Sequence, residues 1–130
     1  MNPPSTKKQK VPKTRANGKW TEARYFAFIR SALRRASSKW PVKFDVKNEG
    51  RRKKPLHTHG RHRFEYQCNE CNRWFPDKEV AIDHINPAGT LRTYEDLPRF
   101  VETLFCEKDN LQILCHGCHG VKTASERKAR

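Results

Sequence analysis

The sequence lacks any apolar run near the ~20 residues that a membrane-spanning helix needs, and it is poor in apolar residues altogether. Only 35% of its 130 residues are hydrophobic, which is below the usual range for a globular domain. A chain this short rarely supports two independent cores, so we expect one small packed domain with extensions. Because the segment MNPPSTKKQK also lacks the apolar stretch of a signal peptide, we expect a soluble cytoplasmic protein with no membrane partner.

Acidic residues are scarce in the first half of the chain. Residues 1–63 contain 19 Lys and Arg against 3 Asp and Glu, whereas residues 64–130 contain 9 against 11. A block this basic is typical of proteins that bind a polyanion, most often nucleic acid. We therefore expect a flexible basic arm over residues 1–19, and over residues 20–63 a nucleic-acid-binding extension made of a basic helix and a linker.

The segment TEARYFAFIRSALRRASSKW has the pattern of an amphipathic helix. Thr21 is a suitable N-cap, and Tyr25 or Phe26, Ile29 and Leu33 recur at helical spacing, with arginines on or beside the opposite face. The residues of this half that we expect to contact nucleic acid are Arg30, Arg34, Arg35, Arg51, Arg52, Lys53 and Lys54. The following stretch PVKFDVK alternates like a short strand.

The second half combines short strands with helices, which predicts an α+β fold. We expect strands near Val80 to His84 and near Leu111 to Leu114. TYEDLPRFVETLFCEK predicts a helix with Thr93 as its cap. HGCHGVKTASERKAR is expected to begin as a turn around its cysteines and to continue as a terminal helix.

Four of the five cysteines form two Cys-x-x-Cys pairs, Cys68 with Cys71 and Cys115 with Cys118. Four thiolates are a typical ligand set of a tetrahedral structural Zn²⁺ site, and the 43 residues between the pairs predict a folded insert. Four free buried cysteines or a redox dithiol are the alternatives. Cys106 is left over and is expected to be a small buried hydrophobic residue.

The stretches DHINP, DNLQILC and CHGCHGVKT contain His84, Asn110 and His119 in this order. With one cysteine pair ahead of the first histidine and the other around the last, the pattern resembles the HNH endonuclease family over about half of the chain. The basic helix resembles small HNH proteins of T7-like tailed phages. The resemblance implies a small ββα-metal (His-Me finger) domain over residues 64–130, held together by a four-cysteine zinc site behind an N-terminal basic helix.

The same resemblance implies an activity and a set of roles. The activity is metal-dependent hydrolysis of phosphodiester bonds in double-stranded DNA, by nicking or double-strand cleavage, in a phage-encoded, homing-like enzyme of the host cytoplasm. Carried over to this sequence, Asp83 and His119 bind a catalytic Mg²⁺ or Mn²⁺, and His84 is the general base. Asn110 braces the loop that carries His84.

Elementary chemistry supports separate roles for the two neighbours Asp83 and His84. Adjacent residues of a strand point in opposite directions, so the two cannot easily bind one ion together. A carboxylate suits Mg²⁺ or Mn²⁺, and a neutral imidazole can accept a proton from water. Lys122 is expected to contact phosphate. At Thr123, where some family members have a further metal ligand, this chain offers only a hydroxyl.

Two alternatives remain open from the sequence: a non-catalytic zinc module that binds nucleic acid, and a nuclease directed at RNA. A monomer and a dimer assembled on DNA both remain compatible with the pattern. The histidines of LHTHGRHRF alternate with Arg and Gly, so we expect them to face the DNA backbone or solvent rather than a further metal.

Overall fold

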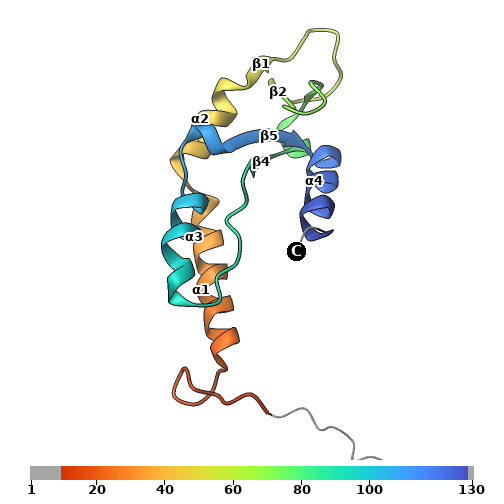
Figure 1. Ribbon diagram of the computed structural model, residues 1–130. Helices are drawn as coiled ribbons and strands as arrows, with labels where there is room; N and C mark the ends of the chain where they lie inside the picture. Colours follow the sequence, from red (N-terminus) through yellow and green to blue (C-terminus); the bar gives the residue numbers. More distant parts are fainter. Residues whose placement is uncertain (1–9, 129–130) are drawn as a thin grey trace, which may run out of the picture.

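The computed structural model describes residues 10–128, which form an α+β fold with four helices and two small sheets (Figure 1). The helices are α1 (Glu22–Ser37), α2 (Pro41–Glu49), α3 (Leu97–Leu104) and α4 (His116–Lys128). The first sheet has the order β1-β2-β3, with β1 (Arg51–Lys53), β2 (Phe64–Gln67) and β3 (Trp74–Phe75), and the second pairs β4 (Val80–His84) with β5 (Leu111–Cys115). No helix within the described part of the chain is long and apolar enough to cross a membrane.

Helix α1 is the predicted amphipathic basic helix. The Thr21 hydroxyl accepts a hydrogen bond from the backbone N–H of Arg24 at 3.2 Å, which satisfies an otherwise unpaired donor of the first turn. Phe26 is buried, and Tyr25, Ile29 and Leu33 pack around the same core cluster; the buried members from the rest of the chain are Ala88, Leu91, Phe100 and Leu104. The prediction of this helix and of its apolar face is confirmed.

The strand predicted for PVKFDVK is wrong, because this segment is helix α2. Pro41 occupies the first turn, where its fixed φ suits a helix and its missing N–H costs nothing. Val42 and Val46 are four residues apart, so they share a face on a helix as well as on a strand. Val46 packs against the cluster of Tyr66, Val80 and Ile113, whereas Phe44, on the other side, is exposed.

Strands β4 and β5 pair antiparallel, from Val80 opposite Cys115 to His84 opposite Leu111. Helix α4 begins at the residue after β5, so both predicted strands and the terminal helix are present. The separate turn expected around the second cysteine pair is absent from this described segment. Instead, Cys115 ends β5 and Cys118 lies in the first turn of α4.

The insert between β4 and β5 folds back onto α1. Thr93 and Asp96 form a capping box ahead of α3, because the side chain of each residue accepts a hydrogen bond from the backbone N–H of the other. Phe100 and Leu104 of α3 are buried in the cluster around Phe26. Figure 1 shows α1 and α3 side by side on one side of the β4–β5 pair and α4 on the other.

Two segments expected to lack regular structure have some. Residues 1–9 of the expected arm lie outside the described residues, but Arg15 and Trp20 form a β-bridge that closes a tight turn. The Arg15 guanidinium lies 4.5 Å from the centre of the Tyr25 ring, which holds this turn against α1. In the expected linker, β1 pairs with β2 from Arg51 opposite Tyr66 onward, so this part is a β-hairpin.

Candidate functional site

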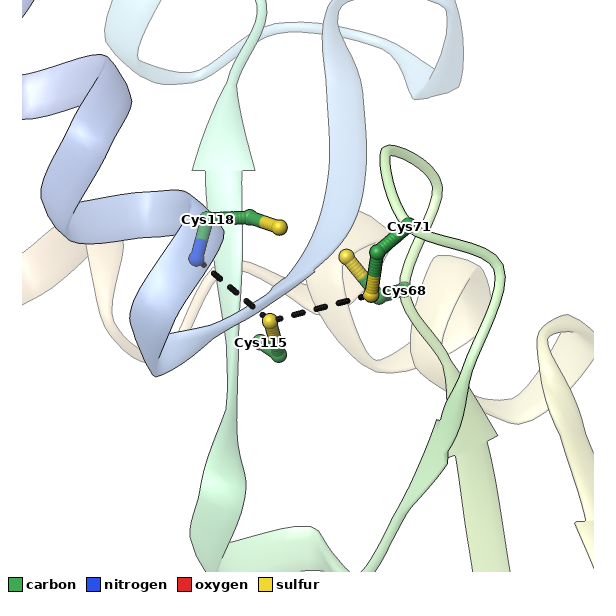
Figure 2. Close-up of side chains that lie close together, drawn as sticks. All are labelled: Cys68, Cys71, Cys115 and Cys118. Atoms are coloured by element: carbon green, nitrogen blue, oxygen red, sulfur yellow. Dashed lines mark hydrogen bonds between the residues drawn. The ribbon is translucent and has the colours of Figure 1, made fainter.

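Four cysteines from two distant parts of the chain meet at one point (Figure 2). Cys68 and Cys71 belong to the turn after β2, whereas Cys115 and Cys118 come from the junction of β5 and α4. Their sulfur atoms all lie within 4.8 Å of one another, and the Sγ atoms of Cys71 and Cys115 are 4.0 Å apart. Sulfur atoms about 2.3 Å from a tetrahedral Zn²⁺ are about 3.8 Å apart, so the cluster has the size that a zinc ion needs.

Hydrogen bonds from backbone N–H groups help to set the shape of this cluster. The carbonyl of Cys68 accepts a hydrogen bond from the N–H of Asn72 at 2.9 Å, and Asn72 has a φ of 62°, which turns the chain tightly. The N–H of Cys118 donates to Cys115 Sγ at 3.4 Å. Cys106 is buried outside the cluster, as predicted.

The thiols of the cluster differ in their acidity. Burial raises the pKa of Cys68, but backbone N–H groups of Cys71, Cys115 and Glu70 outweigh it and lower the pKa to about 6. Hydrogen bonding with the Cys115 thiol and burial raise the pKa of Cys118 to about 12. The thiolate is the form that binds zinc, so Cys68 is ready to bind an ion at neutral pH.

A second group of side chains lines a polar cleft of about 370 Å³ between the end of β4 and the first turns of α4. Asp83, His84, His119 and Thr123 are among its lining residues, and Arg34 of α1 lies at the same cleft. The structure therefore brings together three of the four residues that the sequence predicts to act in catalysis, although 34 residues lie between His84 and His119 in the chain.

Asp83 and His119 face each other across this cleft. The Oδ1 atom of Asp83 lies 3.5 Å from His119 Nε2. Two ligands about 2.1 Å from one divalent ion are about 3.0 Å apart in octahedral and about 3.4 Å apart in tetrahedral geometry. The observed separation is near the tetrahedral value, and the two side chains would approach by about 0.5 Å to share an octahedral ion. The other oxygen, Oδ2, accepts a hydrogen bond from Gln112 Nε2 at 3.0 Å and lies 3.1 Å from Lys122 Nζ. One carboxylate oxygen is thus directed toward His119.

Lys122, which the sequence predicts as a phosphate contact, has three partners within the site. Besides Asp83, its ammonium group donates to the carbonyl of His84 at 2.9 Å and pairs with the Glu126 carboxylate. Glu126 is not among the predicted site residues, although its position four residues after Lys122 is the usual spacing of a helical ion pair. The Thr123 hydroxyl donates to the carbonyl of His119 at 2.9 Å, within α4.

His84 points away from Asp83 and bonds the insert. Its Nε2 lies 2.9 Å from the carbonyl oxygen of Leu104, the last residue of α3. A carbonyl oxygen only accepts, so in the neutral ring Nε2 carries the proton and Nδ1 keeps a free lone pair. Burial, followed by the charges of Lys43 and Arg34, lowers the pKa of His84 below its usual 6.5, against the opposing effects of the Leu104 carbonyl and Asp83. The imidazole is therefore neutral near pH 7.

Asn110 bonds the chain just beyond His84. Its Oδ1 accepts from the N–H of Asn86 at 2.7 Å, and its Nδ2 donates to the carbonyl of Asn86 at 3.1 Å. The carbonyl of Asn110 also accepts from the N–H of Ile85 at 2.9 Å. One side chain thus ties the loop after β4 to the start of β5.

Replacing Asn110 by alanine is expected to lower the free energy of unfolding by about 1–3 kcal/mol, because two hydrogen bonds are lost and the backbone groups of Asn86 lose their partner. Urea unfolding of the purified variant measures this change. Asn48→Ala, at an exposed position of α2, is the control and is expected to change stability by less than about 0.5 kcal/mol. Equal stability of the two variants would contradict a bracing role for Asn110.

The cations predicted to bind nucleic acid lie on α1 and on β1 and its loop. Those on α1 are Arg30, Arg34 and Arg35, and those on β1 and just after it are Arg51, Arg52, Lys53 and Lys54. The Arg52 guanidinium is 3.0 Å from the Glu65 carboxylate and lies over the Trp74 ring. Arg52 therefore has a structural role, whereas the Lys53 side chain is exposed.

No family model, curated protein or solved structure matches this chain. The geometry of the cysteine cluster and of the cleft is therefore the basis for assigning a function.

Proposed function

We propose that the protein is a metal-dependent DNA endonuclease of the HNH type. One observation carries the proposal. Asp83 and His119 lie 3.5 Å apart in a cleft that is also lined by His84, and the neutral His84 ring points away from Asp83 and bonds the carbonyl of Leu104. A nucleic-acid-binding module needs cations and a folded surface, but it does not need this combination. The excess of Lys and Arg in residues 1–63 supports a nucleic acid as the substrate.

Asp83 Oδ1 and His119 Nε2 would hold Mg²⁺ or Mn²⁺. Such an ion, when bound, neutralises charge on a phosphodiester and stabilises the leaving oxygen. Lys122 and Gln112 hold the second oxygen of Asp83, so the carboxylate keeps one orientation. The four cysteines would hold a separate structural Zn²⁺.

His84 activates the attacking water in this proposal. Its Nδ1 accepts a proton from the water as the water oxygen bonds to phosphorus and the bond from phosphorus to the 3′ oxygen breaks. The products carry a 5′-phosphate and a 3′-hydroxyl. The Leu104 carbonyl fixes the tautomer that leaves Nδ1 free, and Asn110 holds the loop behind it.

One cleft cuts one strand, so double-strand cleavage requires two successive nicks or a dimer assembled on DNA. The likeness of the basic helix to small proteins of T7-like phages supports a phage-encoded, homing-like enzyme as part of the same proposal.

The test is a cleavage assay on supercoiled plasmid with purified full-length protein. We expect nicked circles to form with Mg²⁺ or Mn²⁺ and not without an added divalent ion. A duplex RNA of matched sequence serves as the parallel substrate. Absence of plasmid nicking with every divalent ion, or cleavage of RNA alone, would overturn the proposal.

A further inference from the structure

The hairpin of β1 and β2 carries a ten-residue loop, residues 54–63, which the proposed reaction does not use. In Figure 1 this loop extends beyond the rest of the fold, at the end of the molecule away from the start of α1. Its strands are short, and all three residues of β1 are exposed. Most residues of the loop are exposed as well, so the loop is accessible to a partner.

Both sides of the hairpin carry cations. Between Glu49 and Glu65 the sequence has no acidic residue, and its six cations are Arg51, Arg52, Lys53, Lys54, Arg61 and Arg63. Among the described residues, only Arg52 of these six forms an ion pair with a carboxylate. Five positive charges thus remain uncompensated on one projecting element, which favours a polyanionic partner.

One large apolar side chain belongs to this loop between the cations. Leu56 is fully exposed, at 105% of its reference area, and follows Pro55. Single exposed leucines are common on protein surfaces, but this one is flanked on both sides of the loop by cations, and no apolar neighbour in the described part of the chain covers it.

Hydrogen bonds hold the loop in shape. The N–H of Thr58 donates to the carbonyl of Pro55 at 3.0 Å, so Leu56 sits inside a turn. The N–H of Lys54 donates to the carbonyl of Arg63 at 2.8 Å, and the Lys54 ammonium bonds the carbonyl of Gly60. A side chain presented by a constrained turn loses little freedom when it binds.

The base of the hairpin is fixed to the cysteine cluster. Strand β2 ends one residue before Cys68. The N–H of Gln67 donates to the carbonyl of Gly50 at 3.2 Å, and the N–H of Asn69 donates to the carbonyl of Ile113 in β5 at 2.8 Å. The loop thus has a defined position relative to β5.

We propose that this hairpin binds duplex DNA in the minor groove, with Lys53, Arg61 and Arg63 on the phosphates and Leu56 inserted as a wedge between base pairs. Proteins that use β-ribbons enter either groove of DNA, and those that kink DNA from the minor groove insert apolar side chains between base steps. The inference rests on the proposed function only for the choice of DNA as partner.

An anionic membrane is a poorer fit to the same hairpin. One leucine offers too little apolar surface for stable anchoring, since even a myristoyl chain gives only marginal membrane binding. A wedge in DNA, by contrast, needs no more apolar surface than this single side chain.

The test measures binding and bending without added Mg²⁺ or Mn²⁺, so that cleavage does not interfere. Full-length protein is titrated onto a DNA duplex of about 30 base pairs that carries a fluorescent label at each end. Fluorescence anisotropy measures the affinity, and energy transfer between the two labels measures the bend. We expect Leu56→Ala to bind about 10-fold more weakly and to lose most of the bend, and Leu56→Met to keep both. Val11→Ala, at another exposed apolar residue, is expected to behave like the wild type.

The cationic contribution is tested on the same duplex. Arg61→Ala combined with Arg63→Ala is expected to reduce the slope of log affinity against log salt by about 2, because each phosphate contact contributes about 0.9. The inference would be overturned if Leu56→Ala kept the wild-type bend and affinity or if the double arginine variant kept the wild-type salt slope. It would also be overturned if the protein bound phosphatidylserine vesicles or duplex RNA more tightly than DNA. If the wild type nicks plasmid but Leu56→Ala bends and binds DNA like the wild type, only this inference fails. If the wild type bends DNA through Leu56 but never nicks plasmid, only the catalytic proposal fails.

Discussion

Replacing His84 by alanine is expected to lower the rate of plasmid nicking by about 10²–10⁴-fold, the usual contribution of a general base. In the proposed mechanism the variant loses the Nδ1 lone pair that would accept the proton from water, while Asp83 and His119 are expected to remain 3.5 Å apart. Single-turnover nicking with saturating protein measures the chemical step. DNA affinity, measured by anisotropy, is expected to stay within about twofold of the wild type.

The control for this variant is His116→Ala. His116 is the first residue of α4 and is exposed, so its removal is expected to change nicking by less than about twofold. His84→Ala also leaves the carbonyl of Leu104 without its partner, which costs about 1–3 kcal/mol of stability, so the assay requires urea unfolding of both variants. Nicking by folded His84→Ala at the wild-type rate would exclude His84 as the base.

Replacing Cys68 by serine is expected to destabilise the protein strongly. The variant should either be unfolded already at room temperature, and so show no cooperative thermal transition, or have a midpoint of thermal unfolding that is lower by tens of degrees. Structural Zn²⁺ in small domains contributes about 10–16 kcal/mol of binding free energy, which exceeds the usual stability of a domain of this size. Cys68 is fully buried, and its neighbours come from the β5–α4 junction, so the loss of one ligand disturbs both halves of the site. Circular dichroism against temperature measures the effect.

Cys106→Ala is the matched control, because Cys106 is also buried but lies outside the cluster. It is expected to cost about 1–2 kcal/mol and to keep one zinc per chain, as measured by elemental analysis of the purified protein. Chelation of the wild type should reproduce the loss seen in Cys68→Ser. A Cys68→Ser protein with an unchanged transition and full zinc content would contradict a structural zinc site.

Local sequence signals predict an element correctly where the spacing of its apolar residues fits only one type of secondary structure. Phe26, Ile29 and Leu33 share a face only on a helix, and Thr93 with Asp96 gives a recognisable cap ahead of α3. PVKFDVK also fits a strand, because Val42 and Val46 satisfy both periods and because a proline can end one element as well as start the next. The deciding contact, between Val46 and the cluster of Ile113, comes from a distant strand.

The site shows the same division between local and distant information. Spacing along the chain is enough to select the four cysteines, whereas Asp83, His84 and His119 are predicted from the resemblance to the HNH family. Of the groups that fix the orientation of Asp83 and His84, Lys122 is among the predicted residues, whereas Gln112 and the Leu104 carbonyl are not. A backbone carbonyl has no sequence signature, and Gln112 reaches Asp83 only because β4 and β5 pair in one particular register.

The hydrogen bond from His84 to Leu104 has a consequence for the modularity of the chain. Leu104 ends a helix whose buried face is covered by α1, and α2 covers part of the cluster beside β4 and β5. A fragment beginning at Phe64 would expose Phe100 and release the carbonyl that sets the His84 tautomer. The basic extension and the cleft therefore form one folding unit, so exchanging residues 20–63 as a cassette would disturb the cleft, whereas changing surface residues of α1 would not.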